Sequence, residues 1–240
     1  MPADEDQAKR THGFDDPLAA ALWRARAGNE PLDRAAWPDV DLARGKAVGA
    51  ELYARLDQLG IPRIGAKAAV TDAGSQAVFG ASGPLVVPIF ENVAIADGAT
   101  VFMADFTTPF VEAEIGVRVT EDGMTLMPCI EIADLRFFGG PPAIAYLAAD
   151  FGAQGGMIFG EPGDAEGQVA VTVTVDGQEV NRAERSVDDA LRILELVRSE
   201  LDLRSGDGVA TGSFFTPMPL TVGAWAADFG DLGRITFTVT

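Results

Sequence analysis

Apolar residues recur at helical spacing in two segments near the start of the chain. In "DDPLAAALWRARAGNE" and in "DLARGKAVGAELYARLDQLGIP" they fall three or four positions apart, which predicts amphipathic helices. Asp15 or Asp16 is the expected N-cap of the first helix, Pro17 lies in its first turn and Gly28 ends it. Gly60 ends the second helix, whose predicted apolar stripe is Leu42, Val48, Leu52, Leu56 and Leu59.

From Ile61 onward the chain consists of short apolar runs broken by Gly, Pro and Asp, a pattern typical of strands. "VAVTVTVDGQEV" predicts a hairpin that turns at Asp176 and Gly177, because this dipeptide tolerates the positive φ angles of a type I′ turn. One more helix is predicted after Ser186, with Asp189 completing a capping box. Its apolar stripe is Leu191, Ile193, Leu194, Val197 and Leu201.

The final segment, "DGVATGSFFTPMPLTVGAWAADFGDLGRITFTV", predicts three strands separated by a Pro-rich loop and a Gly-Asp turn. We therefore expect one α+β domain with a large antiparallel or rolled sheet. Within it, residues 15 to 65 form an N-terminal helical region and residues 66 to 240 a β-rich core. Residues 1 to 14 are charged and aperiodic, which predicts a disordered tail.

The charge of the chain excludes several classes of partner. It has 240 residues, with 36 acidic against 18 basic side chains and a formal net charge of −18. This charge repels nucleic acid and anionic membranes, so neither is an expected partner. No stretch approaches the roughly 20 apolar residues of a membrane span, and the N-terminus lacks the apolar segment of a secretory signal. We expect a cytoplasmic protein.

Cysteine and histidine are almost absent, which limits the possible chemistry. Cys129 is the single cysteine and His12 the single histidine. An internal disulfide, a histidine-based catalytic triad and a His-rich zinc site are all excluded. Any metal ion must therefore be held mainly by oxygen ligands.

Two glutamates stand in the apolar segment "PFVEAEIGVRV", residues 109 to 119. Strand side chains alternate between faces, so Glu112 and Glu114 share one face while the apolar residues between them share the other. This alternation fits an ordinary half-exposed strand, and it equally fits a pair of metal ligands. The segment alone does not decide between the two.

A third glutamate stands in a more apolar setting. In "LMPCIEIADLRFFGG", Glu131 lies between Ile130 and Ile132, on a face that we expect to be buried. A buried carboxylate requires an ionic partner such as Arg136 or Arg118, or a bound cation. Three carboxylates from two strands suit a hard divalent cation such as Mg²⁺, which prefers oxygen ligands.

Four segments, in order, resemble the fumarylacetoacetate hydrolase superfamily, in its branch of 2-keto-4-pentenoate hydratases and 4-oxalocrotonate decarboxylases. "GAKAAV" is similar to the family's G-[YF]-K-x-G, "VEAEIGVRV" to V-E-A-E-I-A-F-V, and "CIEIADLRF" to A-L-E-I-V-D-S-R-I. The final segment resembles the family's G-D-x-V-x-T-G-S and the residues that follow it. The resemblance extends from about Leu32 to Thr240.

The resemblance implies a β-rich roll, assembly into homo-oligomers and a Mg²⁺ or Mn²⁺ site formed by Glu112, Glu114 and Glu131. It also implies small anionic 2-oxo or 2-hydroxy-dienoic acids as substrates. The cation would bind the substrate's carboxylate and 2-oxo oxygen and stabilise an enolate.

Four other residues receive roles through the same resemblance. Lys67 matches the family's lysine and is expected to position the substrate carboxylate, or to relay a proton if desolvation lowers its pKa; the alternative is a surface lysine. Arg136 is expected to bind a carboxylate, or else to pair with Asp134 or Glu131. Thr211 and Ser213 are expected to donate hydrogen bonds to substrate, or only to shape a turn.

The chain departs from the family pattern at two places. Leu85, in "SGPLVVPIF", stands where the hydratases usually carry an acidic residue, which favours C–C cleavage over water addition. "AADFGAQGG" keeps Asp150 of the family's A-D-N segment but has Phe151 in place of Asn, which suggests a more apolar substrate or a changed reaction. The loop between Glu114 and Glu131 is also shorter than usual.

Three hypotheses follow. The first, supported by the overall resemblance, is a metal-dependent hydratase of a 2-hydroxy-2,4-dienoate. The second is a decarboxylase of a 4-oxalocrotonate-like acid, or another lyase or hydrolase of the superfamily, and CO₂ release separates it from the first. The third is a repurposed, non-catalytic protein that keeps the fold, for which metal binding without turnover would be the evidence.

Overall fold

Two β-sheets form the larger part of the molecule in the computed structural model, which describes residues 13 to 240. The larger sheet has seven strands, in the order β3-β2-β11-β5-β6-β8 with β12 paired to β5. These strands are β2 (Arg63–Ala69), β3 (Leu85–Phe90), β5 (Pro109–Thr120), β6 (Gly123–Asp134), β8 (Gln154–Phe159), β11 (Gly208–Ser213) and β12 (Met218–Pro219).

The smaller sheet has five strands, in the order β10-β9-β13-β14-β4. They are β4 (Thr100–Val101), β9 (Gln168–Val175), β10 (Gln178–Ser186), β13 (Gly223–Asp228) and β14 (Arg234–Val239). Two short strands, β1 (Leu32–Asp33) and β7 (Phe137–Phe138), pair in parallel elsewhere. The main apolar core takes side chains from both sheets, including Val111, Ile130, Val171, Trp225 and Phe237.

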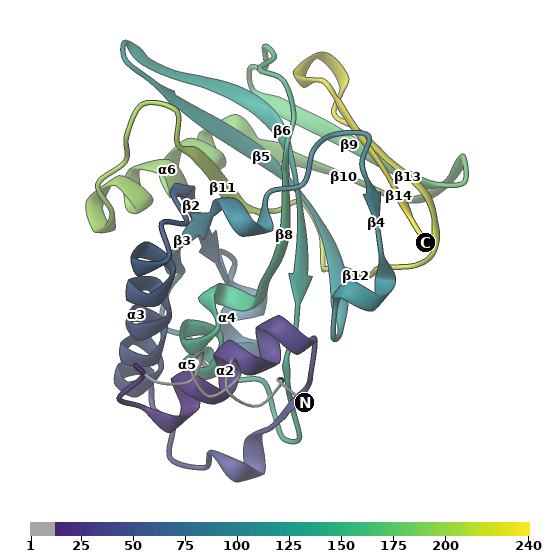
Figure 1. Cartoon of the computed structure of the whole chain (residues 1–240). Helices are drawn as coiled ribbons and strands as arrows, with labels where there is room; N and C mark the ends of the chain where they lie inside the picture. Colours follow the sequence, from purple (N-terminus) through teal and green to yellow (C-terminus); the bar gives the residue numbers. More distant parts are fainter. Residues whose placement is uncertain (1–12) are drawn as a thin grey trace.

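The helices occupy two separate places (Figure 1). Helices α2 (Pro17–Gly28), α3 (Leu42–Gln58) and α5 (Ile144–Ala149) gather below the sheets, whereas α6 (Val187–Glu200) lies beside β11. A Cβ on Gly45 of α3 would lie 2.1 Å from the carbonyl oxygen of Ala145, so glycine allows α3 and α5 to meet. Helix α4 (Ala73–Phe79) follows β2 directly.

The predicted fold class is confirmed, with a curled mixed sheet and helices at the N-terminus. Asp16 caps α2 and accepts a hydrogen bond from the Leu18 amide. The β9–β10 hairpin turns at Asp176 (φ 49°) and Gly177 (φ 77°), as its sequence predicted. Predicted tail residues 1 to 12 lie outside the described residues. No helix within residues 13 to 240 is long and apolar enough to cross a membrane.

Some details differ from the sequence-based predictions. Ser186 accepts a hydrogen bond from the Asp188 amide, while Asp189 pairs with Arg192, so the predicted capping box is wrong in its second half. Asp is too short to reach back as Glu does. Leu42 and Leu59, predicted in the α3 stripe, are exposed at its two ends. Helices α4 and α5 were not predicted, because segments this short carry little periodicity.

Candidate metal centre

The pairing of β5 with β6 brings the three glutamates together. Glu112 lies directly opposite Glu131 in the register, and Glu114 lies opposite Cys129. Each glutamate offers a carboxylate oxygen, and these oxygens all lie within 4.8 Å of one another. Glu114 and Glu131 are each only 1% exposed. The interpretation of this face as an ordinary solvated one is therefore wrong, since the opposite face also packs in the core.

Lys67 projects from β2 into the carboxylate cluster. Its ammonium group pairs with Glu131 and donates a hydrogen bond of 2.9 Å to the carbonyl oxygen of Gly152. The side chain is buried, so the alternative of a surface lysine is wrong. Strand β11 lies between β2 and β5 and pairs with both, so Lys67 of β2 lies one strand away from the glutamates of β5.

Burial and mutual repulsion shift the pKa values of all three carboxyls. Burial and the neighbouring Glu131 raise the pKa of Glu114 to about 7. The same two causes, with Glu114, hold the pKa of Glu112 well above its ordinary value. Burial raises the pKa of Glu131 while Lys67 opposes the rise. These shifts show that a cluster of three carboxylates is disfavoured in its fully ionised form, which a bound cation would stabilise.

Lys67 has a raised pKa. Burial alone would lower the pKa of this ammonium, but the charges of Glu131, Glu112 and Glu114 outweigh burial and the net shift is upward. The condition named for proton relay by Lys67, a pKa lowered by desolvation, is therefore not met. A raised pKa favours the ammonium form, which donates hydrogen bonds.

A cavity of about 750 Å³ opens onto the cluster. Lys67, Glu112, Glu131 and Ser213 line it, so it contains four of the predicted site residues. Much of the remaining wall is apolar, including Phe110, Leu135, Leu147, Phe79 and Phe215. The cavity has the size and the mostly apolar lining of a small-molecule site, with a few charged groups in its lining.

Three other predicted residues do not line this cavity. Glu114 is buried and accepts a hydrogen bond of 2.6 Å from the Gly212 amide. Thr211 is fully buried, and its hydroxyl donates to the Ile115 carbonyl at 2.7 Å. Arg136 forms ion pairs with Asp134 at 2.9 Å and Asp150 at 3.0 Å. The structure thus shows the alternative given for Arg136, an ion pair with Asp134. The substrate contacts predicted for Thr211 and Arg136 stay predictions.

Sequence reasoning missed Gly212 and Arg185. Gly212 has a φ of +97°, and a Cβ there would lie 2.2 Å from the hydroxyl oxygen of Thr71. Only glycine fits this backbone, which aims its amide at Glu114. The sequence signal for it was the glycine in "ATGSF". Arg185 reaches this turn from β10 and carries no such signal, because its partners lie 26 and 27 positions away.

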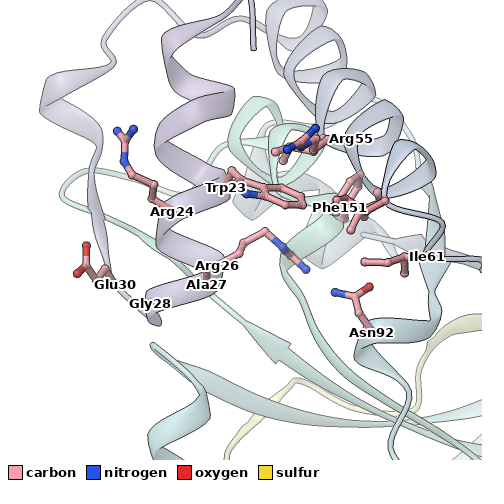
Figure 2. Close-up of a pocket in the computed structure, with 13 residues that line it drawn as sticks. Trp23, Arg24, Arg26, Ala27, Gly28, Glu30, Arg55, Ile61, Asn92 and Phe151 are labelled. Carbon is pink, nitrogen blue, oxygen red and sulfur yellow. The ribbon is translucent and has the colours of Figure 1, made fainter. Parts of the chain in front are cut away.

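Phe151 does not line the cavity beside the glutamates. It lines a second cavity of about 680 Å³, together with Trp23, Arg26, Arg55 and Asn92 (Figure 2). Its ring lies 5.7 Å from that of Phe90, and the Arg26 guanidinium lies 5.4 Å from its centroid. The neighbouring Gly152 lines the cavity beside the glutamates instead, and the more apolar substrate or changed reaction that Phe151 suggested stays a prediction.

Leu85 packs against residues that line the cavity beside the glutamates. It is buried in a cluster with Leu147 and Ala153, and both of these line the cavity. The only acid lining the cavity besides the glutamates, among the residues described, is Asp72. Its carboxylate caps α4, accepting hydrogen bonds from Ser75 and Gly74, and these hold its pKa below the usual value.

Solved structures of known proteins share this fold. The structure is similar to 4-oxalocrotonate decarboxylase from Pseudomonas putida G7 complexed with magnesium and adipate, with a TM-score of 0.80 and 18% identity over 93% of this chain and 96% of that one. It is also similar to 5-carboxymethyl-2-hydroxymuconate delta-isomerase from Mycobacterium smegmatis, with a TM-score of 0.57 and 15% identity over 75% of this chain and 80% of that one.

A third similar structure is 2-hydroxyhepta-2,4-diene-1,7-dioate isomerase from Mycobacterium marinum, with a TM-score of 0.55 and 12% identity over 75% of this chain and 76% of that one. No protein-family model and no curated protein matches the sequence. At these identities the likeness concerns the fold. The chain has the fold of the fumarylacetoacetate hydrolase superfamily, as the four sequence segments predicted.

Proposed function

We propose that this protein is a divalent-metal-dependent lyase that cleaves a C–C bond in a small 2-oxo acid, with decarboxylation of a 4-oxalocrotonate-like acid as the reaction best supported. The observation that carries the proposal is the cluster of Glu112, Glu114 and Glu131, two of which, Glu112 and Glu131, line an otherwise largely apolar cavity. The similarity in fold to a 4-oxalocrotonate decarboxylase supports the same reaction.

The residues fit a divalent cation. All three donors are carboxylates, which suit Mg²⁺ or Mn²⁺. Two are almost fully buried; Lys67 pairs directly with Glu131, and the charge of Arg185 also acts on Glu114. Glu112, Glu114 and Glu131 would hold the cation, which when bound would supply positive charge beside a substrate's carboxylate and 2-oxo oxygen.

Lys67 would bind and orient the acid. Its ammonium group lies at the cavity wall, fixed by Glu131 and by the Gly152 carbonyl. Because its pKa is raised, it remains a cation able to donate hydrogen bonds to a substrate carboxylate. Removing its charge should weaken substrate binding and leave Glu131 without its ionic partner.

The apolar wall favours loss of CO₂. In a 4-oxalocrotonate-like acid, the bond to the distal carboxylate carbon breaks and its electron pair moves through the double bond to the 2-oxo oxygen. A proton added at that oxygen gives CO₂ and a 2-hydroxy-2,4-dienoate. Lys67 is the only cation lining the cavity among residues 13 to 240, so a distal carboxylate would lie against apolar side chains, where its charge is destabilised relative to neutral CO₂.

Hydration, the first hypothesis from the sequence, is the second candidate. Water addition requires a group that accepts a proton from water and one that gives a proton to carbon. Asp72 is committed to capping α4, and Leu85 offers no carboxyl. Glu112 lines the cavity, but as a ligand of the cation it would be held ionised and could not exchange a proton, so the cavity offers less for hydration than for decarboxylation.

The test is product analysis with both substrate classes. We expect the protein with Mg²⁺ to release CO₂ from 4-oxalocrotonate and to leave 2-hydroxypenta-2,4-dienoate unchanged, as followed by NMR and CO₂ detection. Excess EDTA should abolish the release, and Glu131→Gln should abolish it while the exposed Glu195→Gln should not. Conversion of the dienoate into a 4-hydroxy-2-oxo acid, the product of water addition, would establish the hydratase instead. Metal binding with no turnover of either acid would favour the non-catalytic hypothesis.

Homo-oligomer assembly, which the resemblance implies, belongs to the same proposal. The exposed apolar side chains include Phe102, Phe138, Val180 and Val222, which lie at scattered positions in the chain. Sedimentation velocity would measure the number of subunits.

A further inference from the structure

Strand β11 is irregular at the point where it meets the glutamates. Its register with β5 is regular from Gly208 to Ala210, resumes at Ser213 opposite Glu114, and shifts in between. Two residues, Thr211 and Gly212, therefore stand opposite the single Ile115. This is a β-bulge, a local irregularity that turns backbone groups out of the ladder and is frequent beside functional sites.

The bulge has a direct consequence for Glu114. The Gly212 amide leaves the ladder and donates a hydrogen bond of 2.6 Å to Oε2 of Glu114. This contact holds one oxygen of the carboxylate, which fixes the orientation of the other. The position requires glycine, because its φ is +97° and Thr71 fills the space of a Cβ.

The same bulge leaves two backbone carbonyls that need donors. Buried carbonyl groups are almost always paired, so these must find partners outside the ladder. Arg185 supplies them: Nη2 donates to the Thr211 carbonyl at 2.6 Å and Nη1 donates to the Gly212 carbonyl. Nη1 also donates to the Thr211 hydroxyl at 3.1 Å. The planar guanidinium thus spans both residues of the bulge, which one ammonium group could not do.

We infer that Arg185 is a positioning residue for the metal centre: by binding both carbonyls of the Thr211–Gly212 bulge it holds the Gly212 amide on Glu114. Arg185 comes from β10 of the smaller sheet, whereas Glu114 belongs to the larger sheet. The residue therefore couples one sheet to the metal ligand of the other. This inference rests on the proposed function, since it requires that Glu114 binds a cation.

The test measures Mn²⁺ affinity by electron paramagnetic resonance of free Mn²⁺, in the full-length protein without substrate. We expect Arg185→Gln to weaken binding by about 10- to 100-fold, as loss of an outer partner of a metal ligand typically does. Arg185→Lys keeps the charge but lacks the two guanidinium nitrogens that donate to the two carbonyls, so it should bind Mn²⁺ with intermediate affinity. The control is Arg182→Gln, on the same strand, whose side chain is 65% exposed and pairs only with Glu179.

A purely structural role predicts a different result. Arg185→Gln would then lower the thermal midpoint of the metal-free protein but leave the Kd for Mn²⁺ unchanged, and this outcome overturns the inference. If Arg185→Gln does not fold, Arg185→Lys decides, and Mn²⁺ affinity equal to wild type overturns the inference. If the wild-type protein itself does not bind Mn²⁺, the proposed function fails, and the inference fails with it.

Discussion

Two clusters of buried charge lie close together in this protein, and they differ in their balance. One contains Arg26, Arg136, Asp134 and Asp150, two cations with two anions. The other contains the three glutamates and Lys67, three anions with one cation. Both draw on β6, which supplies Asp134 to the first and Glu131 to the second.

The balanced cluster has the features of a structural element. Asp150 accepts from Arg26 at 2.5 Å and from Arg136 at 3.0 Å, which ties α2 to the end of β6. Asp134 also accepts from the amides of Thr107 and Thr108. With its charges paired, this cluster needs no ligand. The unbalanced cluster keeps excess negative charge beside a cavity, which is the arrangement that a cation would complete.

The largest expected effect comes from breaking the balanced cluster. Asp150→Asn would leave Arg26 and Arg136 buried with one carboxylate between them, and removal of one partner of a buried ion pair costs about 3–5 kcal/mol. We expect a loss of that size in the free energy of unfolding, measured by urea denaturation. Glu195→Gln, which removes an exposed ion pair with Arg198, is the control and should cost about 1 kcal/mol or less. A small loss for Asp150→Asn would contradict the structural role.

The second prediction concerns pH and the unbalanced cluster. Glu114 binds its proton more tightly in the folded chain, where its pKa is about 7, than in the unfolded chain, where a glutamate has its ordinary pKa of 4.5. The stability it contributes is therefore fully present below its unfolded pKa and is lost as pH rises through about 7. In EDTA, we expect the free energy of unfolding to fall by up to about 3 kcal/mol between about pH 5 and 8.

Glu114→Gln is the control for that titration, because it has no proton to lose at this position. Its stability should fall less steeply than that of the wild type over the same pH range. Equal slopes for the two proteins would contradict the raised pKa of Glu114. Metal affinity should follow the reverse course and increase with pH, since protons and the cation compete for the same carboxylates.

The smallest effect on stability is expected where the effect on metal binding is greatest. At about pH 5 in EDTA, Glu114 is still protonated in the folded chain and Gln is a neutral side chain of similar size, so the free energy of unfolding of Glu114→Gln should lie within about 1 kcal/mol of wild type. Its affinity for Mn²⁺ should fall by more than the ~100-fold typical of outer partners. The contrast with Asp150→Asn sharpens the comparison, and a destabilisation as large as that of Asp150→Asn would show that Glu114 is structural instead.

The sequence predicted the elements with strong local signals. Asp16 with Pro17 located the start of α2, and Asp176 with Gly177 located the hairpin turn, because capping and turn chemistry depend on neighbouring residues. The four family segments located Lys67 and the three glutamates. Alternation alone did not reveal whether the glutamate face of β5 is exposed, since that depends on what packs against the strand.

What the sequence did not predict depends on contacts between distant segments. For Arg136 the sequence left substrate binding and pairing with Asp134 both open, and the structure shows the pairing with Asp134 together with a second partner, Asp150. Phe151 and Gly152 are neighbours that line different cavities, and periodicity does not distinguish them. Arg185 acts on the glutamate cluster through a bulge in another strand. Strand register, β-bulges and the partners of buried ion pairs depend on tertiary contacts, which local sequence patterns do not encode.

The most direct test of the central claim is calorimetric titration with oxalate, a small mimic of a 2-oxo acid. The account predicts that the wild-type protein binds oxalate in the presence of Mg²⁺ and loses that binding when EDTA removes the metal. The substrate carboxylate would then depend on a cation held by the glutamates, as proposed. Oxalate binding that is undiminished by EDTA, or absent at saturating Mg²⁺, would contradict a metal-dependent site in the unbalanced cluster.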